Sequence, residues 1–212
     1  ELIETWRANR NGTRARVFVA ASGFGKTALA MRLAGQNEAV LASHFCRFDD
    51  AKTRGPREII AALAYRIGQR LPDFKTKLED LQREAKGRSL ATVAESVDKL
   101  CDELLIKPLC AIEEPTQAAS GRLLLVIDAL DEVDDVGGSF LKLIAKDLPE
   151  KLPPWLALLA TTRPDLGIQT QLKQQRVEVT TLDDDRCGEV CDEDLRVFCT
   201  KILKFCQPSR LR

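Results

Sequence analysis

The chain has 212 residues, and its 32 lysines and arginines balance its 32 aspartates and glutamates. This length suffices for one α/β domain with a full core, and the neutral balance argues against the basic excess of nucleic-acid-binding proteins. No apolar run reaches the roughly 20 residues that a membrane-spanning helix needs, and no signal-peptide pattern opens the chain, so we expect neither nucleic acid nor a membrane as a partner.

The first predicted elements surround a loop with two glycines. A β-forming run predicts a strand over residues 15–20, and the run after the loop predicts a helix over residues 26–35. The loop between them reads Ala20-Ala21-Ser22-Gly23-Phe24-Gly25-Lys26-Thr27. Its two glycines tolerate positive φ, which lets successive backbone N–H groups point at an anion beside the N-terminus of the helix.

The side chains of this loop predict how a nucleotide and Mg²⁺ bind. Lys26 is expected to reach the β- and γ-phosphates, and the Thr27 hydroxyl is expected to bind Mg²⁺. Ala20 stands where the usual pattern G-x-x-x-x-G-K-[ST] has its first glycine, which is tolerated if Ala20 keeps a negative φ. The alternative is an ordinary strand–turn–helix with a lysine at the helix start. The predicted nucleotide-binding residues are Ala21, Ser22, Gly23, Phe24, Gly25, Lys26, Thr27 and Ala28.

A second strand and a helix are predicted next along the chain. The strand is expected from Val40 to Phe48, and a charged loop follows it. Pro56 suits the first turn of the next helix, and Pro72 is expected to end that helix. Apolar residues at helical spacing predict its buried face, which consists of Ile59, Ile60, Leu63, Ala64, Ile67 and Leu71.

Two further helices and a loop are predicted before the next strand. Residues 74–86 predict a charged, mostly exposed helix. The apolar stripe over residues 90–105 predicts a helix packed in the core, and a coiled-coil partner helix is the alternative. Pro108, Pro115 and the small polar residues up to Gly121 predict a loop.

A second motif ends the third predicted strand. Residues 123–127 form a continuous apolar run, which is typical of a strand buried on both faces, and Asp128 follows it. Because the carboxyl ends of such strands meet where ligands bind, Asp128 is expected to hold Mg²⁺ together with Thr27. Asp131 or Glu132 on the following turn is expected to orient or deprotonate the attacking water. The alternative is an acidic cluster that caps a helix.

The remaining elements complete a βαβ pattern, which predicts a parallel sheet covered on both faces. A helix is expected over residues 139–148, with prolines punctuating the connection after it. A fourth strand is expected over residues 155–161 and a fifth over residues 176–180. A turn at residues 182–185 and a last helix from Asp192 follow.

Arg163 provides a third candidate for the same site. It follows the fourth predicted strand, at the sheet edge expected to carry Thr27 and Asp128. Its planar guanidinium suits a γ-phosphate. The alternative is a surface arginine before a helix.

The chain has seven cysteines, an odd count that fits reduced thiols in a cytosolic protein. Four of them gather near the end without the paired C-x₂-C spacing of a zinc site, so we expect no zinc there and expect Cys199 and Cys206 to lie on one face of a terminal helix as small hydrophobic side chains. These four are Cys187, Cys191, Cys199 and Cys206.

Together these residues resemble a NACHT-type member of the STAND class of P-loop NTPases, which are signalling ATPases of innate-immune, cell-death and fungal incompatibility proteins. The matching stretches are the P-loop, the acidic signature Asp128-Ala129-Leu130-Asp131-Glu132 and the arginine motif Thr161-Thr162-Arg163-Pro164. The exit of the second strand and the helix that begins at Pro56 are also similar. The resemblance covers nearly the whole chain.

The resemblance implies a fold and a domain organisation. The fold is a three-layer α/β P-loop NTPase with a mostly parallel five-stranded sheet flanked by helices. Residues 1–14 form a lead-in segment, residues 15–182 the NTPase core, and residues 183–212 a terminal helix that begins a following helical domain. Because the chain begins at Glu1, we expect it to be a piece of a longer protein.

The resemblance also implies roles for the site residues. Asp131, Glu132 and Arg163 are expected to be catalytic, with Arg163 as sensor 1, and Thr27 and Asp128 are expected to bind Mg²⁺. The nucleotide is expected to be ATP or ADP. Because the motifs do not determine whether adenine or guanine is bound, GTP is a second candidate.

Two other residues carry expectations of their own. Trp6 is expected either to wall the base pocket or to pack as a core aromatic residue. His44, the only histidine, is expected to be structural.

The resulting hypothesis is a slow Mg²⁺-dependent ATPase that acts as a cytoplasmic molecular switch within a larger signalling protein. Its protein partners would bind through domains outside this chain, and its active form would assemble as a homo-oligomer. One alternative is a nucleotide-stabilised scaffold without turnover. A processive motor of the AAA+ kind ranks last, because the chain has one tyrosine and two tryptophans to supply pore-loop aromatics.

Overall fold

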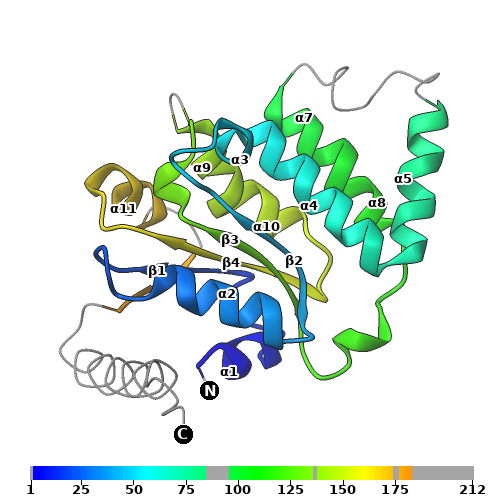
Figure 1. The fold of residues 1–212 in the computed structure, drawn as a ribbon. Coiled ribbons are helices and arrows are strands. Elements are labelled where there is room, and N and C mark those ends of the chain that lie inside the picture. The colour runs from blue at the N-terminus through cyan, green and yellow to red at the C-terminus, as the bar shows by residue number, and fades with distance from the viewer. Residues whose placement is uncertain (1, 85–95, 136–137, 174–176, 183–212) are drawn as a thin grey trace, which may run out of the picture.

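The computed structural model describes residues 2–84, 96–135, 138–173 and 177–182. Within these ranges five strands form one all-parallel sheet in the order β2-β3-β4-β1-β5 (Figure 1). The strands are β1 (Ala15–Val19), β2 (Val40–Phe45), β3 (Leu123–Asp128), β4 (Leu156–Thr162) and β5 (Glu178–Thr181). The predicted α/β sheet is therefore confirmed. The predicted turn after Leu182 and the predicted last helix lie outside the described residues.

Helices cover both faces of the sheet. Side chains alternate along each strand, so Phe18 packs on one face while Val17 and Val19 pack on the other. The face of Phe18 is covered by α1 (Leu2–Ala8) and α2 (Lys26–Gln36). The opposite face is covered by α4 (Pro56–Arg70), α7 (Val97–Cys101), α8 (Lys107–Cys110), α9 (Ser139–Lys142), α10 (Leu148–Lys151) and α11 (Leu166–Lys173).

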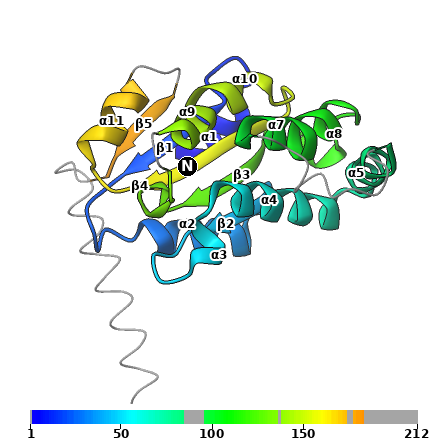
Figure 2. The same ribbon diagram turned by 90° about the horizontal axis from the view of Figure 1, so that it is seen from above.

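Helix α4 confirms the buried face that the spacing of its apolar residues predicted. Pro56 occupies its first turn, where a missing N–H costs nothing, and all six residues of the predicted apolar face are buried. Pro72 does not merely end this helix, because it begins α5 (Pro72–Glu84), whose Phe74 is buried while most of its other side chains are exposed. In both ribbon views α4, α5, α7 and α8 lie together on one side of the molecule (Figure 2).

Two prolines that were predicted outside helices lie inside them. Pro108 follows the π-helical segment η1 (Asp102–Ile106), and Pro149 follows a second π-helical segment, η4 (Leu143–Asp147). A π turn shifts the hydrogen bonds by one residue: the N–H of Lys107 donates to the carbonyl of Asp102, five residues earlier. We attribute the tolerance of a residue that has no N–H to this shift. The predicted loop therefore begins after Cys110, and the predicted helix over 139–148 runs on to Lys151.

Strand β2 ends three residues before its predicted end at Phe48. The N–H of Cys46 still donates to the carbonyl of Asp128 (3.2 Å), but the N–H of Arg47 donates instead to the Thr53 hydroxyl (3.0 Å). Asp50 then caps the short helix α3 (Ala51–Arg54). The chain thus leaves the sheet in a tight turn directly beside the end of β3.

None of the helices in the described ranges has the length and apolar composition to cross a membrane.

Candidate functional site

The loop between β1 and α2 has the backbone conformation that the sequence predicted. Gly23 has a φ of 90° and Gly25 a φ of 75°, both in the region that favours glycine. A Cβ at either position would meet no atom within 4 Å, so the requirement is conformational and not steric. Ala129 is the single non-glycine residue of the described ranges with positive φ, so Ala20 keeps the negative φ that replacement of the first glycine requires.

Lys26 closes this loop from within. Its Nζ donates hydrogen bonds to the carbonyl of Ala20 (2.6 Å) and to the carbonyl of Ala21 (2.7 Å), and its side chain is largely buried. The ammonium group therefore lies across the loop, at the wall of the cleft that the loop borders. The same contacts help to hold the loop in shape.

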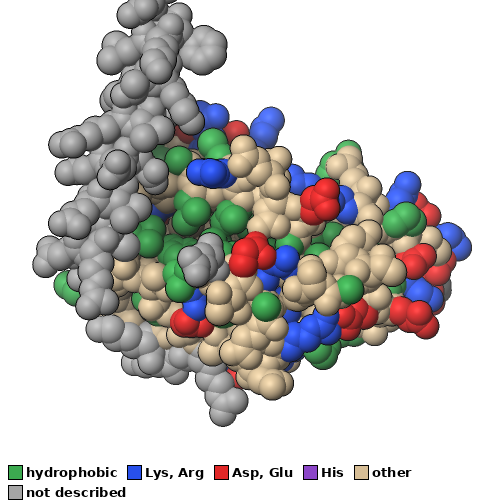
Figure 3. Space-filling model, turned by 90° about the horizontal axis from the view of Figure 1, so that it is seen from below, with side chains coloured by type: hydrophobic (Ala, Val, Ile, Leu, Met, Phe, Trp, Pro, Cys, Tyr) green, Lys and Arg blue, Asp and Glu red, His purple; other side chains and the backbone are tan. Residues whose placement is uncertain are grey.

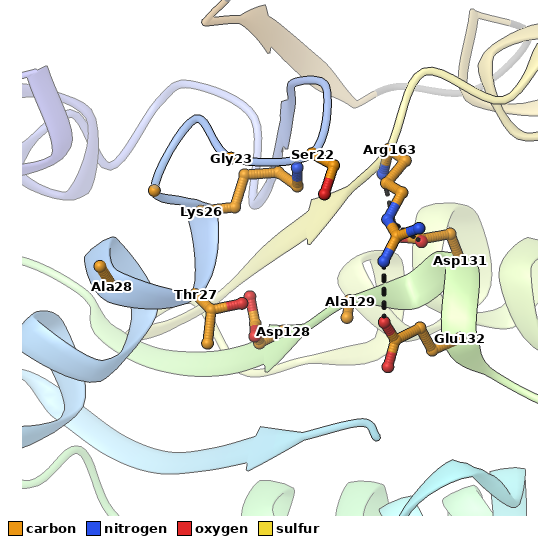
Figure 4. A pocket seen from close by; sticks show the side chains of 11 residues that line it. Ser22, Gly23, Lys26, Thr27, Ala28, Asp128, Ala129, Asp131, Glu132 and Arg163 are labelled. Atoms are coloured by element: carbon orange, nitrogen blue, oxygen red, sulfur yellow. Dashed lines mark hydrogen bonds and ion pairs between the residues drawn. The ribbon is translucent and has the colours of Figure 1, made fainter. Parts of the chain in front are cut away.

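A cleft of 290 Å³ brings the predicted site residues together. Because all strands are parallel, the segments that follow β1, β3 and β4 meet at one edge of the sheet, and β4 lies between the other two. Figure 4 shows their side chains converging on this cleft. Ala21 and Phe24 are the two predicted residues that do not line it. Its lining residues are Ser22, Gly23, Gly25, Lys26, Thr27, Ala28, Asp128, Ala129, Asp131, Glu132 and Arg163.

Thr27 and Asp128 offer oxygen atoms suited to Mg²⁺. The Thr27 hydroxyl and the Asp128 carboxylate point toward one another (Figure 4). Asp128 is 2% exposed, and a buried carboxylate of this kind requires compensating partners. No cluster of three or more histidine, cysteine or acidic side chains that could hold a metal occurs in the described part of the chain. Mg²⁺ needs no such cluster, because it is commonly held by one or two carboxylates together with phosphate oxygens and waters. The donor set therefore fits the predicted ion.

Arg163 is paired with both acidic residues that follow β3. Its Nε lies 3.2 Å from the Asp131 carboxylate, and its Nη2 lies 3.2 Å from the Glu132 carboxylate (Figure 4). The backbone N–H of Arg163 also donates to Asp131 (2.9 Å). All three residues line the cleft as expected, and the guanidinium is paired with both carboxylates.

Two contacts of the site were not found from the sequence. The N–H of Phe48 donates to the Glu132 carboxylate (2.8 Å), which joins the segment after β2 to the acidic turn. The hydroxyl of Thr161 donates to the Asp128 carboxylate (2.5 Å). Thr161 is one residue from the end of β4, next to the strand that ends in Asp128, and this adjacency is the signal that could have found it.

Trp6 does not line the cleft. Its side chain is 5% exposed and packs with Ile3 and Phe18 on the α1 face of the sheet, while its Nε1 donates to the carbonyl of Thr13 (3.1 Å). The structure therefore supports the alternative in which Trp6 packs as a core aromatic residue.

A separate apolar groove between α1 and α2 shares no lining residue with the cleft. Figure 3 shows the underside of the molecule, where apolar side chains gather among charged ones.

Burial also affects the titration of two residues near the end of β2. Burial raises the pKa of the Cys46 thiol to about 12, with Asp128, Glu132 and Asp131 adding to the effect. Cys46 is therefore a protonated thiol beside the site and not a nucleophile. Burial lowers the pKa of His44, whose Nε2 lies 2.6 Å from the carbonyl of Thr53. This contact is consistent with the predicted structural role of His44.

The depressed pKa of His44 predicts a loss of stability in acid. An unfolded histidine takes up its proton at about pH 6.5, whereas the folded one resists protonation until the pH is lower. Neutral His44 therefore contributes to the stability of the folded chain above about pH 6.5, and this stabilisation is lost as the pH falls through the pKa of His44 in the folded chain. The free energy of unfolding in urea, measured between pH 5 and 8, should therefore decrease toward low pH. A His44→Gln variant, which keeps an N–H donor but does not titrate, should show a smaller slope of this free energy against pH. An unchanged slope in that variant would contradict the assignment.

The comparison with models of known families matches residues 1–163 to the family described as Nephrocystin 3, N-terminal. This range contains the loop before α2, the acidic turn after β3 and Arg163. The comparison with curated proteins found no match.

Proposed function

The chain belongs to the nephrocystin 3 N-terminal family, and from this premise and the geometry of the cleft we propose that it binds ATP or ADP with Mg²⁺ and hydrolyses ATP slowly. The observation that carries the proposal is the cleft shared by the loop before α2 and the end of β3. We further propose that it is the ATPase core of a NACHT-type STAND protein, with GTP as a second candidate nucleotide.

Binding would rest on the loop and on two oxygen ligands. The backbone N–H groups around Gly23–Lys26 and the N-terminus of α2 would hold the phosphates, and Lys26 would move its ammonium from the loop carbonyls to them. Thr27 and Asp128 would hold Mg²⁺. The ion, when bound, supplies charge neutralisation of the phosphate oxygens.

Hydrolysis would depend on the acidic turn after β3. Asp131 accepts from both the backbone and the side chain of Arg163, so we assign it an anchoring role for the segment after β4. Glu132 would orient the attacking water or take its proton. A γ-phosphate would compete with the two carboxylates for the guanidinium of Arg163, which would release Glu132 for this task.

The biological role proposed is a switch. ATP and ADP would select between conformations of a larger cytoplasmic signalling protein, because a ligand shifts an equilibrium only by its different affinity for the two states. Partners would bind through domains outside this chain, and the active form would be a homo-oligomer.

The second candidate is a nucleotide-stabilised scaffold without turnover. The pairing of Arg163 with both Asp131 and Glu132 favours it, because a cleft that kept these contacts would hold a nucleotide without a free water-orienting carboxylate. Steady-state phosphate release separates the two candidates. Release no greater than that of a Lys26→Ala variant, despite tight binding, would favour the scaffold.

A thermal-shift titration tests binding. At a ligand concentration about 100-fold above Kd, binding adds roughly 2.7 kcal/mol of stability. Mg·ATP and Mg·ADP are expected to raise the melting temperature. The shift with Mg·GTP, compared with that for Mg·ATP, shows whether the site prefers adenine or guanine. The absence of a shift with all three, both in this chain and in a longer form that includes the following domain, would contradict the proposal.

A further inference from the structure

The side chain of Thr161 contacts the acidic motif that the proposed function uses. Thr161 lies in β4, which is hydrogen-bonded to β1 on one side and to β3 on the other. Thr161 and Phe18 are paired in the register of β4 and β1, so their side chains lie on the same face of the sheet. The Thr161 side chain is fully buried. The hydroxyl therefore lies in the interior of the sheet, within hydrogen-bonding distance of Asp128.

One hydroxyl makes two hydrogen bonds here. It donates its single hydrogen to Oδ1 of Asp128 (2.5 Å), and its oxygen accepts from the backbone N–H of Ala129 (2.9 Å). The first bond occupies Oδ1 and restrains the side-chain torsions of Asp128, which leaves Oδ2 available. A carboxylate ligand held in this way is preorganised for a metal ion.

The second bond acts on the acidic turn. Ala129 has a φ of 60°, the left-handed region in which a non-glycine residue is strained. This conformation turns the chain from β3 into the 3₁₀ segment η3 (Leu130–Glu132), which carries Asp131 and Glu132. The Thr161 hydroxyl satisfies the N–H that the turn directs inward, and so helps to hold the turn.

We propose that Thr161 is a positioning residue that orients Asp128 for Mg²⁺ and fixes the turn that presents Asp131 and Glu132. The inference rests on the proposed function, since it assigns Asp128 to the metal. It adds that metal binding and water orientation depend on one buried hydroxyl that contacts neither the nucleotide nor the ion.

The test compares Thr161→Val, which keeps the shape and removes the hydroxyl, with Thr161→Ser, which keeps the hydroxyl. Binding of a fluorescent ADP analogue is measured in the full 212-residue chain, both in EDTA and across a Mg²⁺ titration. Thr161→Val is expected to raise the Mg²⁺ concentration for half-maximal enhancement of binding about 10- to 100-fold. It should leave the affinity in EDTA unchanged, and Thr161→Ser should restore the Mg²⁺ response.

Three outcomes would overturn the inference. In the first, Thr161→Val keeps the Mg²⁺ midpoint of the unchanged chain. In the second, Thr161→Val loses affinity for the ADP analogue equally in EDTA, which indicates a merely structural role. In the third, Thr161→Ser fails to restore the Mg²⁺ response. Should Thr161→Val not fold, Thr161→Ala, which places no methyl group against the carboxylate, is used in its place. An unchanged chain that binds the ADP analogue without any Mg²⁺ effect would refute the proposed metal site itself, and this result is read from the control before any variant is compared.

Discussion

Replacing Lys26 by alanine is expected to abolish the stabilisation of the chain by Mg·ATP and Mg·ADP. Lys26 is the first residue of α2, and its ammonium lies at the wall of the cleft, 2.6 Å from the carbonyl of Ala20. The loss should approach the roughly 2.7 kcal/mol that ligand at about 100-fold over Kd contributes. Differential scanning fluorimetry with and without nucleotide measures it.

Arg32→Ala is the matched control for this variant. Arg32 belongs to the same helix, is exposed and does not line the cleft, so its removal deletes one positive charge without touching the site. This control should retain the full nucleotide-dependent shift. If Lys26→Ala kept the shift as well, the loop would not be the phosphate-binding element.

Replacing Glu132 by glutamine is expected to reduce phosphate release about 10²- to 10⁴-fold while nucleotide binding is retained. The amide keeps the size of the side chain and can still accept from the N–H of Phe48, which donates to Glu132 at 2.8 Å. It cannot take a proton from water. Single-turnover release of phosphate from Mg·ATP measures the change.

Asp131→Asn provides the comparison within the same turn. Asp131 accepts from the backbone N–H of Arg163 (2.9 Å) and pairs with its guanidinium, so this variant should loosen the segment after β4 and lower the melting temperature without nucleotide. Glu132→Gln should change that melting temperature much less. Equal turnover in Glu132→Gln and the unchanged chain would remove Glu132 from catalysis.

The strands and the loop before α2 could be predicted because local sequence decides them. The run before Asp128 is buried along its whole length, and Gly23 and Gly25 adopt the positive φ that only glycine takes readily. Parallel strands then bring Thr27, Asp128 and Arg163 to one edge, whatever the details of the connections. These parts of the site follow from the order of elements.

The remaining features depend on contacts between distant segments. The prediction that Pro108 and Pro149 lie outside helices failed because two π turns, which no sequence pattern signals, shift the hydrogen bonds ahead of them. The pairing of Arg163 with Glu132 and the bond from Thr161 to Asp128 depend on the order of strands, with β4 between β1 and β3. Helical and strand periodicity carries no information on that order.

A crystal structure of the chain with Mg²⁺ and a non-hydrolysable ATP analogue tests the central claim most directly. The account predicts that the backbone N–H groups of residues 23–26 contact the β- and γ-phosphates and that Mg²⁺ is bound by Thr27 together with Asp128, directly or through water. Phosphates bound elsewhere on the chain, or a metal bound without either of these two side chains, would contradict it.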